Sequence, residues 1–228
     1  MTTQPASTLN NGSPVDTAAI HRAALDHYGD LRALGALIAT AFADLSAVRW
    51  LVPGPRAHRS EIFGRWAELH IADALTRGHV DVIDGPDSSD LPLAVAVWFT
   101  NPHAAPAPDY DQQLQRAVSR THIDRFRTLD AVMDDAHPGG LQHHHLLLLA
   151  VHPAYQDQGY GSKLLAHHHR ELDDAGLPGY LEAASPDSAR LYQRHGYAHL
   201  DEPLTLPGNT SPDLWPMWRN PRTTPTAS

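Results

Sequence analysis

One segment constrains the fold of this chain more than any other, because it joins a strand, a glycine-containing loop and a helix. Residues 146–165 read LLLLAVHPAYQDQGYGSKLL. The apolar run that ends at Val151 predicts a central strand buried on both faces, and the loop after it opens a helix. The first turn of a helix has backbone N–H groups without intrahelical partners and carries the positive end of the helix dipole. The segment therefore predicts a site for an anionic group such as a pyrophosphate.

Two glycines shape this predicted site. Gly159 and Gly161 lack a Cβ atom, so a ligand can approach the backbone closely and the loop can take conformations closed to other residues. The pattern Gln-x-x-Gly-x-Gly, which begins at Gln156, is not the dinucleotide-binding Gly-x-Gly-x-x-Gly and lacks the Lys-Ser/Thr of a P-loop. An isolated glycine pair of this kind is more often a simple turn before a helix.

Helical and strand patterns alternate along the rest of the chain. Apolar spacing predicts helices at 31–44, after Pro55, and at 110–135, 161–175 and 186–195. Runs typical of strands lie at 79–83, 93–100, 145–151, 180–184, 197–200 and 214–219. The first two of these strands form a predicted hairpin. This order predicts an α/β fold with a mixed, twisted sheet and helices on both faces.

Length and composition are those of one ordinary globular domain. The chain has 228 residues, 42% of them hydrophobic and 19% charged, which is enough for one sizeable core. Polar ends predict flexible tails at 1–17 and 221–228 around a folded domain at 18–220. Residues 1–16 lack a basic start and an apolar run, and no later stretch is long enough to span a bilayer. We therefore expect a cytoplasmic protein without a membrane partner.

Charge and the lack of cysteine exclude several functions. Acidic side chains number 26 and basic ones 17, for a net charge of −9. That field repels phosphate backbones, which argues against a nucleic-acid partner, and it attracts a cationic substrate. With no cysteine in the sequence, disulfides, thiol nucleophiles and cysteine-ligated zinc are excluded.

The segment at 146–165 resembles the acyl-CoA signature of the GNAT superfamily, Gln/Arg-x-x-Gly-x-Gly/Ala after a strand that ends in Val-x-Pro, here Val151-His152-Pro153. Residues 180–197 (YLEAASPDSARLYQRHGY) also resemble the family, with an acidic strand residue, a helical tyrosine and a final Gly-Tyr. Over most of residues 30–220, including AFAD at 41–44 and AVAVW at 94–98, the sequence is most similar to the puromycin N-acetyltransferases of actinomycetes. It departs from them at 183–188 and in its polar N-terminal tail.

The resemblance implies a GNAT fold with acetyl-CoA as co-substrate, held where the strands at 145–151 and 180–184 splay apart. The backbone N–H of Val151 would polarise the thioester carbonyl, and the backbone of Leu149 would bind the pantetheine arm. The cofactor-binding set implied by the resemblance is Leu149, Val151, Gln156, Asp157, Gln158, Gly159, Tyr160, Gly161, Ser162 and Ser188.

Two further residues are candidates for the chemistry. Direct acyl transfer to an amine needs a neutral amine, a positioned electrophile and a proton for the departing thiolate. The resemblance assigns that proton to Tyr192, in a helix with Ser185 as N-cap and Pro186 as first residue; a core aromatic is the alternative. Glu182, in an otherwise apolar strand, is a candidate general base, directly or through water, or an anchor for the acceptor ammonium. Its alternative is a solvated strand residue.

Seventeen histidines raise the question of a metal. In the triplet at 143–145 only His143 and His145 share a strand face, and in the triplet at 167–169 neighbouring residues diverge by about 100° around the helix. No carboxylate at i+3 or i+4 spacing completes either set convincingly, and His168 falls on the apolar side of its helix, as a packed histidine does. We therefore expect no metal.

Together these features predict an acetyl-CoA-dependent N-acetyltransferase acting on the amine of a small molecule. An antibiotic, in resistance or self-protection, and an amino-acid-like metabolite are the expected acceptors. The alternatives are a non-catalytic acyl-CoA or small-molecule-binding module of GNAT fold and a protein or peptide N-acetyltransferase. The acceptor site is expected at about 45–70 and 100–140, with Trp50 and Trp98 as candidate aromatic walls. A homodimer is left open.

Overall fold

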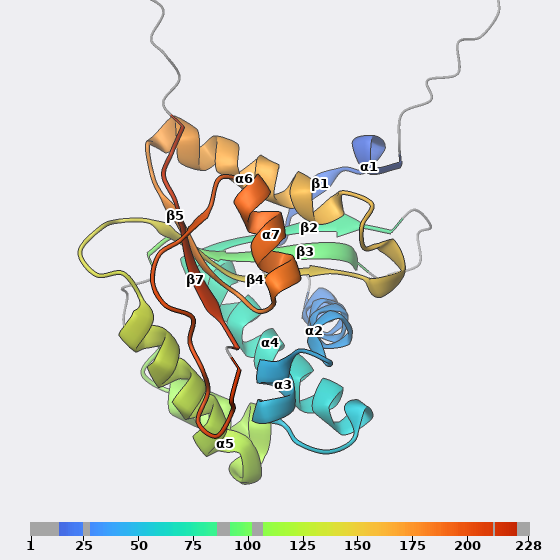
Figure 1. The fold of residues 1–228 in the computed structure, drawn as a ribbon. Helices are drawn as coiled ribbons and strands as arrows, with labels where there is room; N and C mark the ends of the chain where they lie inside the picture. Colours follow the sequence, from blue (N-terminus) through green and yellow to red (C-terminus); the bar gives the residue numbers. More distant parts are fainter. Residues whose placement is uncertain (1–13, 25–27, 86–91, 102–106, 212, 223–228) are drawn as a thin grey trace, which may run out of the picture.

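The computed structural model describes residues 14–24, 28–85, 92–101, 107–211 and 213–222. In this part of the chain one mixed sheet of seven strands has helices on both faces (Figure 1), which confirms the predicted fold class. The strand order is β1-β2-β3-β4-β5-β7-β6. The strands are β1 (Ile20–Arg22), β2 (Gly78–Asp84), β3 (Pro92–Phe99), β4 (His144–Val151), β5 (Gly179–Ala183), β6 (Ala198–His199) and β7 (Trp215–Arg219).

Helices divide between the two faces of the sheet. They are α1 (Pro14–Thr17), α2 (Tyr28–Phe42), α3 (Ser46–Leu51), α4 (Arg56–Arg77), α5 (Tyr110–Ala136), α6 (Tyr160–Ala175) and α7 (Pro186–Arg194), with a 3₁₀ turn at Pro153–Tyr155. α2 to α5 cover one face and α6 and α7 the other (Figure 1). Each face has its own apolar core, because alternate strand residues such as Ala96 and Val97 point to opposite sides. α5 is kinked at Ser119, whose φ is 66°.

The centre of the sheet opens between its two parallel neighbours. β4 and β5 pair through His144–Leu146 and Gly179–Leu181 alone, although β4 continues to Val151. The other neighbouring strands are antiparallel. A register shift between β3 and β4 places one extra residue at Leu147, and such bulges bend a strand and increase its twist. β4 and β5 therefore diverge after Leu146 and Leu181, as the predicted splayed junction requires.

Most predicted elements are present within a few residues of the expected bounds. The predicted hairpin is the antiparallel pair of β2 and β3, and α6 ends at Gly176, whose φ is 65°. The short elements α1, β1 and α3 were not predicted. Most of the expected tails, namely 1–13 and 223–228, lie outside the described residues, but residues 14–17 of the first one form α1. No helix in the described ranges is long and apolar enough to cross a membrane.

Candidate acyl-CoA and amine site

A pocket of about 560 Å³ fills the opening between β4 and β5. One side is formed by the carboxyl half of β4 and the start of α6, and the other by the end of β5 and by α7. The C-terminal end of α2 contributes Ala41 and Phe42, and Leu45 follows it. The pocket thus lies where the chain supplies both unpaired strand edges and the N-terminus of a long helix.

The loop before α6 exposes the backbone at this N-terminus. Gly159 is the N-cap residue, with φ of 93° in the left-handed region, and no side chain caps the helix. Asp157 also has a positive φ, 60°. The Gln156 side chain donates to the carbonyl of Val151 at 3.2 Å, which ties the loop to the end of β4. The first N–H groups of α6 therefore have no capping side chain within the protein, which suits an anionic ligand.

Eleven of the twelve residues expected in the cofactor and catalytic sets line this one pocket. They are Leu149, Val151, Gln156, Asp157, Gly159, Tyr160, Gly161, Ser162, Glu182, Ser188 and Tyr192. The exception is Gln158, whose side chain donates to the carbonyl of Ala154 at 3.2 Å and which does not line the pocket. A Cβ at Gly161 would point between β4 and α7, at 3.7 Å from both Val151 and Leu191.

Tyr192 lies on the buried face of α7. Ser185 caps that helix by accepting from the backbone N–H of Ser188 at 3.1 Å, and Pro186 is its first residue, as predicted. The ring of Tyr192 is 5.9 Å from that of Tyr197, at 66°. Burial raises the pKa of the Tyr192 phenol well above its usual value. The hydroxyl therefore stays protonated at neutral pH and is available as a donor.

Glu182 is the first residue of β5 beyond its pairing with β4. Its side chain is only 2% exposed, so the solvated alternative does not hold. His145 Nε2 lies 2.8 Å from Glu182 Oε2, while Oε1 is buried without a hydrogen-bond partner. Burial by itself raises the pKa of the Glu182 carboxyl, but His145, Tyr180 and His137 together outweigh it and hold that pKa below its usual value. Glu182 therefore presents a negative charge at the inner wall of the pocket.

The other histidines and tryptophans singled out from the sequence lie elsewhere. His168 is fully buried and stacks on Trp98 at 4.0 Å between ring centroids, so its predicted packed role is confirmed. Trp98 is itself fully buried in the core, and Trp50 lines a different, shallow depression. Neither tryptophan lines this pocket. Among the described residues of the segments 45–70 and 100–140, only Leu45 lines the pocket.

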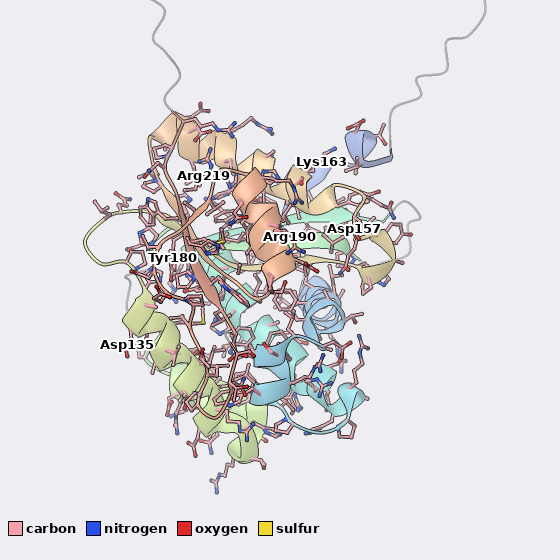
Figure 2. All side chains as sticks on the ribbon, viewed as in Figure 1. Asp135, Asp157, Lys163, Tyr180, Arg190 and Arg219 are labelled. Carbon is pink, nitrogen blue, oxygen red and sulfur yellow. The ribbon has the colours of Figure 1, made fainter. Side chains whose placement is uncertain are left out.

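Sequence reasoning missed two groups near the pocket. Arg194, the last residue of α7, lines the pocket and adds a positive charge to it. The only sequence signal for this residue was a basic side chain in the last turn of a predicted helix. Lys163 of α6 donates to the carbonyls of Val15 at 2.5 Å and Asp16 at 2.9 Å, and Figure 2 shows Lys163 at the end of α6 nearest α1. α1 is thereby held beside the Gly159 loop.

Comparisons with known proteins agree with this geometry. The family model for the acetyltransferase (GNAT) domain matches residues 127–199, which include the loop before α6 as well as Glu182 and Tyr192. A solved structure from Corynebacterium glutamicum, described as histone acetyltransferase HPA2 and related acetyltransferase, is 25% identical with a TM-score of 0.61, covering 92% of this chain and 99% of that one. Arylalkylamine N-acetyltransferase 2 from Aedes aegypti is 14% identical with a TM-score of 0.62, covering 90% of this chain and 99% of that one. No curated protein matches the sequence.

The fold is therefore that of the GNAT acetyltransferases. The family model and the solved structures together support placing the chain in the GNAT acetyltransferase superfamily.

Proposed function

We propose that this protein is an acetyl-CoA-dependent N-acetyltransferase whose acceptor is the amine of a small molecule. One observation carries the proposal: a single pocket is lined by the uncapped N-terminus of α6, by the carboxylate of Glu182 and by Tyr192. An anion site, a cation site and a proton donor are thus combined in one cavity.

The proposed donor site uses the backbone. The pyrophosphate of acetyl-CoA would accept from the N–H groups at residues 157–162, stabilised by the helix dipole. The main chain of Leu149 and Val151, beyond the β4–β5 pairing, would bind the pantetheine arm and the thioester carbonyl. Ser188 and Arg194, both on α7 and both lining the pocket, are placed to support the pantetheine and phosphate portions.

The proposed transfer is direct. The neutral amine attacks the thioester carbonyl carbon. The C–N bond forms, the C–S bond breaks, and the nitrogen loses its extra proton to a base or to water. Tyr192 donates its phenolic proton to the departing thiolate, which becomes the thiol of CoA, and the Tyr192 phenolate is then reprotonated by water. The raised pKa of the buried phenol keeps it protonated at neutral pH, so the proton is in place before this step.

We assign to Glu182 the binding of the positively charged acceptor. A carboxylate whose pKa is held below the usual value is a weak base for an alkylammonium, since proton transfer to it is uphill. It is a good counter-ion for the same group, and its burial strengthens that attraction. We therefore propose Glu182 as the ammonium anchor, and Glu182→Gln should raise the acceptor KM more than it lowers kcat.

A small acceptor is supported by the modest volume of about 560 Å³, which the donor must share. The net charge of −9 favours encounter with a cation. The resemblance to puromycin N-acetyltransferases supports an antibiotic or an amino-acid-like metabolite. The Corynebacterium structure is described as a histone acetyltransferase, so peptides form the competing arm of the test.

The test compares kcat/KM for a panel of small amines, including puromycin, with that for lysine-bearing peptides at one acetyl-CoA concentration. We expect a small amine to be preferred. A peptide preferred by more than about tenfold, or about 1.4 kcal/mol of transition-state discrimination, would overturn the small-molecule assignment. CoA binding without transfer to any amine would instead indicate a non-catalytic binding module.

A further inference from the structure

Three side chains from three different elements converge beside the pocket. His137 directly follows α5, His145 lies on β4 and Glu182 on β5. One potential ligand atom from each lies within 4.8 Å of the other two, and no other such group of histidine, cysteine or carboxylate side chains occurs among the described residues. Neither histidine triplet of the sequence supplies more than one member of this group. His145 instead meets partners that neither helical nor strand spacing could reveal.

The donor atoms suit one class of ion. Two imidazole nitrogens and one carboxylate oxygen, with a fourth position open, make up the ligand set of many zinc sites. Ligand distances of about 2.0–2.2 Å in a tetrahedral site separate two donor atoms by about 3.4 Å. His145 Nε2 and Glu182 Oε2 are 2.8 Å apart, so these two atoms would have to separate by about 0.6 Å to reach that spacing. The His137 atom lies within 4.8 Å of both, so a small shift of its ring would complete the set.

Burial gives the ion a reason to bind there. The Glu182 side chain is 2% exposed, and its Oε1 is buried with no hydrogen-bond partner. A buried polar atom without a partner is unusual in a folded protein and costs free energy. Since Glu182 also lines the pocket, the pocket provides a path by which an ion can enter.

A second layer of contacts orients His137. Its Nε2 lies 3.0 Å from Nε2 of His143, and His143 Nδ1 donates to the carbonyl of Leu141 at 2.7 Å. Tyr180 packs edge-on against the His137 ring, with centroids 4.7 Å apart. Figure 2 shows Tyr180 on β5 on the same side of the molecule as Asp135 near the end of α5. Such outer contacts fix the ring of a metal-binding histidine.

We propose that His137, His145 and Glu182 form a site for a divalent ion of the zinc class. The ion would occupy the Glu182 carboxylate, so it would also prevent that group from receiving the acceptor ammonium. Only this inhibitory consequence rests on the proposed acetyltransferase function; the binding site itself does not.

The experiment measures Zn²⁺ binding to the metal-free protein by calorimetry, and Co²⁺ binding by its visible absorption, without acetyl-CoA or amine. Wild type should bind one ion more tightly than the variants, and Mg²⁺ should not compete. His137→Ala should weaken binding by more than the roughly 10–100-fold typical of losing an outer-layer partner, and Glu182→Gln should do the same. Because Glu182 is buried and its variant can fail to fold, the partly exposed His137 carries the test by itself.

The control is His58→Ala. His58 and His122 also pair through Nε2 atoms, at 3.3 Å, but no carboxylate completes that pair into a three-ligand group. Its removal should leave the tight Zn²⁺ site unchanged.

Absence of one-to-one binding in wild type, or equal binding by the His137 and His58 variants, would overturn the site. If the protein acetylates an amine, the Zn²⁺ concentration that half-inhibits transfer should rise in His137→Ala in proportion to the dissociation constant for Zn²⁺. Zinc binding without any acetyl transfer would refute the proposed function and keep the site.

Discussion

Gly159→Ala tests the proposed pyrophosphate site most directly. Gly159 has a φ of 93° at the N-cap of α6, a conformation that costs a residue with a Cβ about 1–2 kcal/mol. A Cβ there would meet Val15 Cγ2 at 3.7 Å and Val15 Cγ1 at 3.8 Å, which are ordinary contacts. The loss of stability should therefore be backbone strain alone, about 1–2 kcal/mol.

The chain contains a matched control at the other end of the same helix. Gly176 has a φ of 65°, and a Cβ there would meet nothing within 4 Å. Gly176→Ala should therefore lose a similar amount of stability without adding bulk near the pocket. Denaturant unfolding of the two variants should give changes that agree within about 1 kcal/mol.

The two variants should differ in CoA affinity. An alanine methyl at Gly159 stands on the loop that the pyrophosphate would approach, so we expect binding weaker by about tenfold or more, or at least about 1.4 kcal/mol. Gly176→Ala should bind CoA like wild type, and Gly159→Asp, which adds negative charge, should abolish binding. The measurement is CoA affinity by calorimetry on each folded variant. Unchanged affinity in both Gly159 variants would refute the site, and equal loss in both alanine variants would assign the effect to stability.

Two other predictions concern the proton donor and a buried acid. Tyr192→Phe should lower kcat about a hundredfold and leave CoA affinity unchanged, whereas Tyr197→Phe should keep wild-type turnover; wild-type turnover in the Tyr192 variant, with chemistry limiting, would remove its role. Burial raises the pKa of Asp130 from 3.8 to about 6, although Tyr110 donates to it at 2.9 Å. The folded state thus holds this proton more tightly than the unfolded state, and its stabilising contribution is lost as pH rises from about 4 through 6. At 1.36 kcal/mol per pKa unit, ionised Asp130 costs at most about 3 kcal/mol, so Asp130→Asn should be more stable than wild type at pH 8 and lose that advantage toward pH 4; lower stability at pH 8 would contradict this.

The helices and strands that were predicted correctly have local causes. α7 begins where Ser185 caps the helix and Pro186 follows, and α6 ends at Gly176. Each signal lies within a few residues of the boundary it sets, so the amino-acid order alone contains it. The elements that were not predicted are short. β1 has three residues and pairs with β2, which provides its backbone partners from a distant part of the chain.

The pocket itself was predicted through motif order, since spacing along the chain keeps the end of β4 beside the start of α6. The neighbours of Glu182 were not predicted. His145 precedes it by 37 residues, and the two meet because β4 and β5 are parallel and pair only at 144–146 and 179–181. His137 reaches the same place from the end of α5. Sheet register and helix packing depend on the whole core. The amino-acid order therefore determined the glycine loop before α6 and the helix that contains Tyr192, whereas only the tertiary structure decided that the Glu182 carboxylate is buried beside His137 and His145.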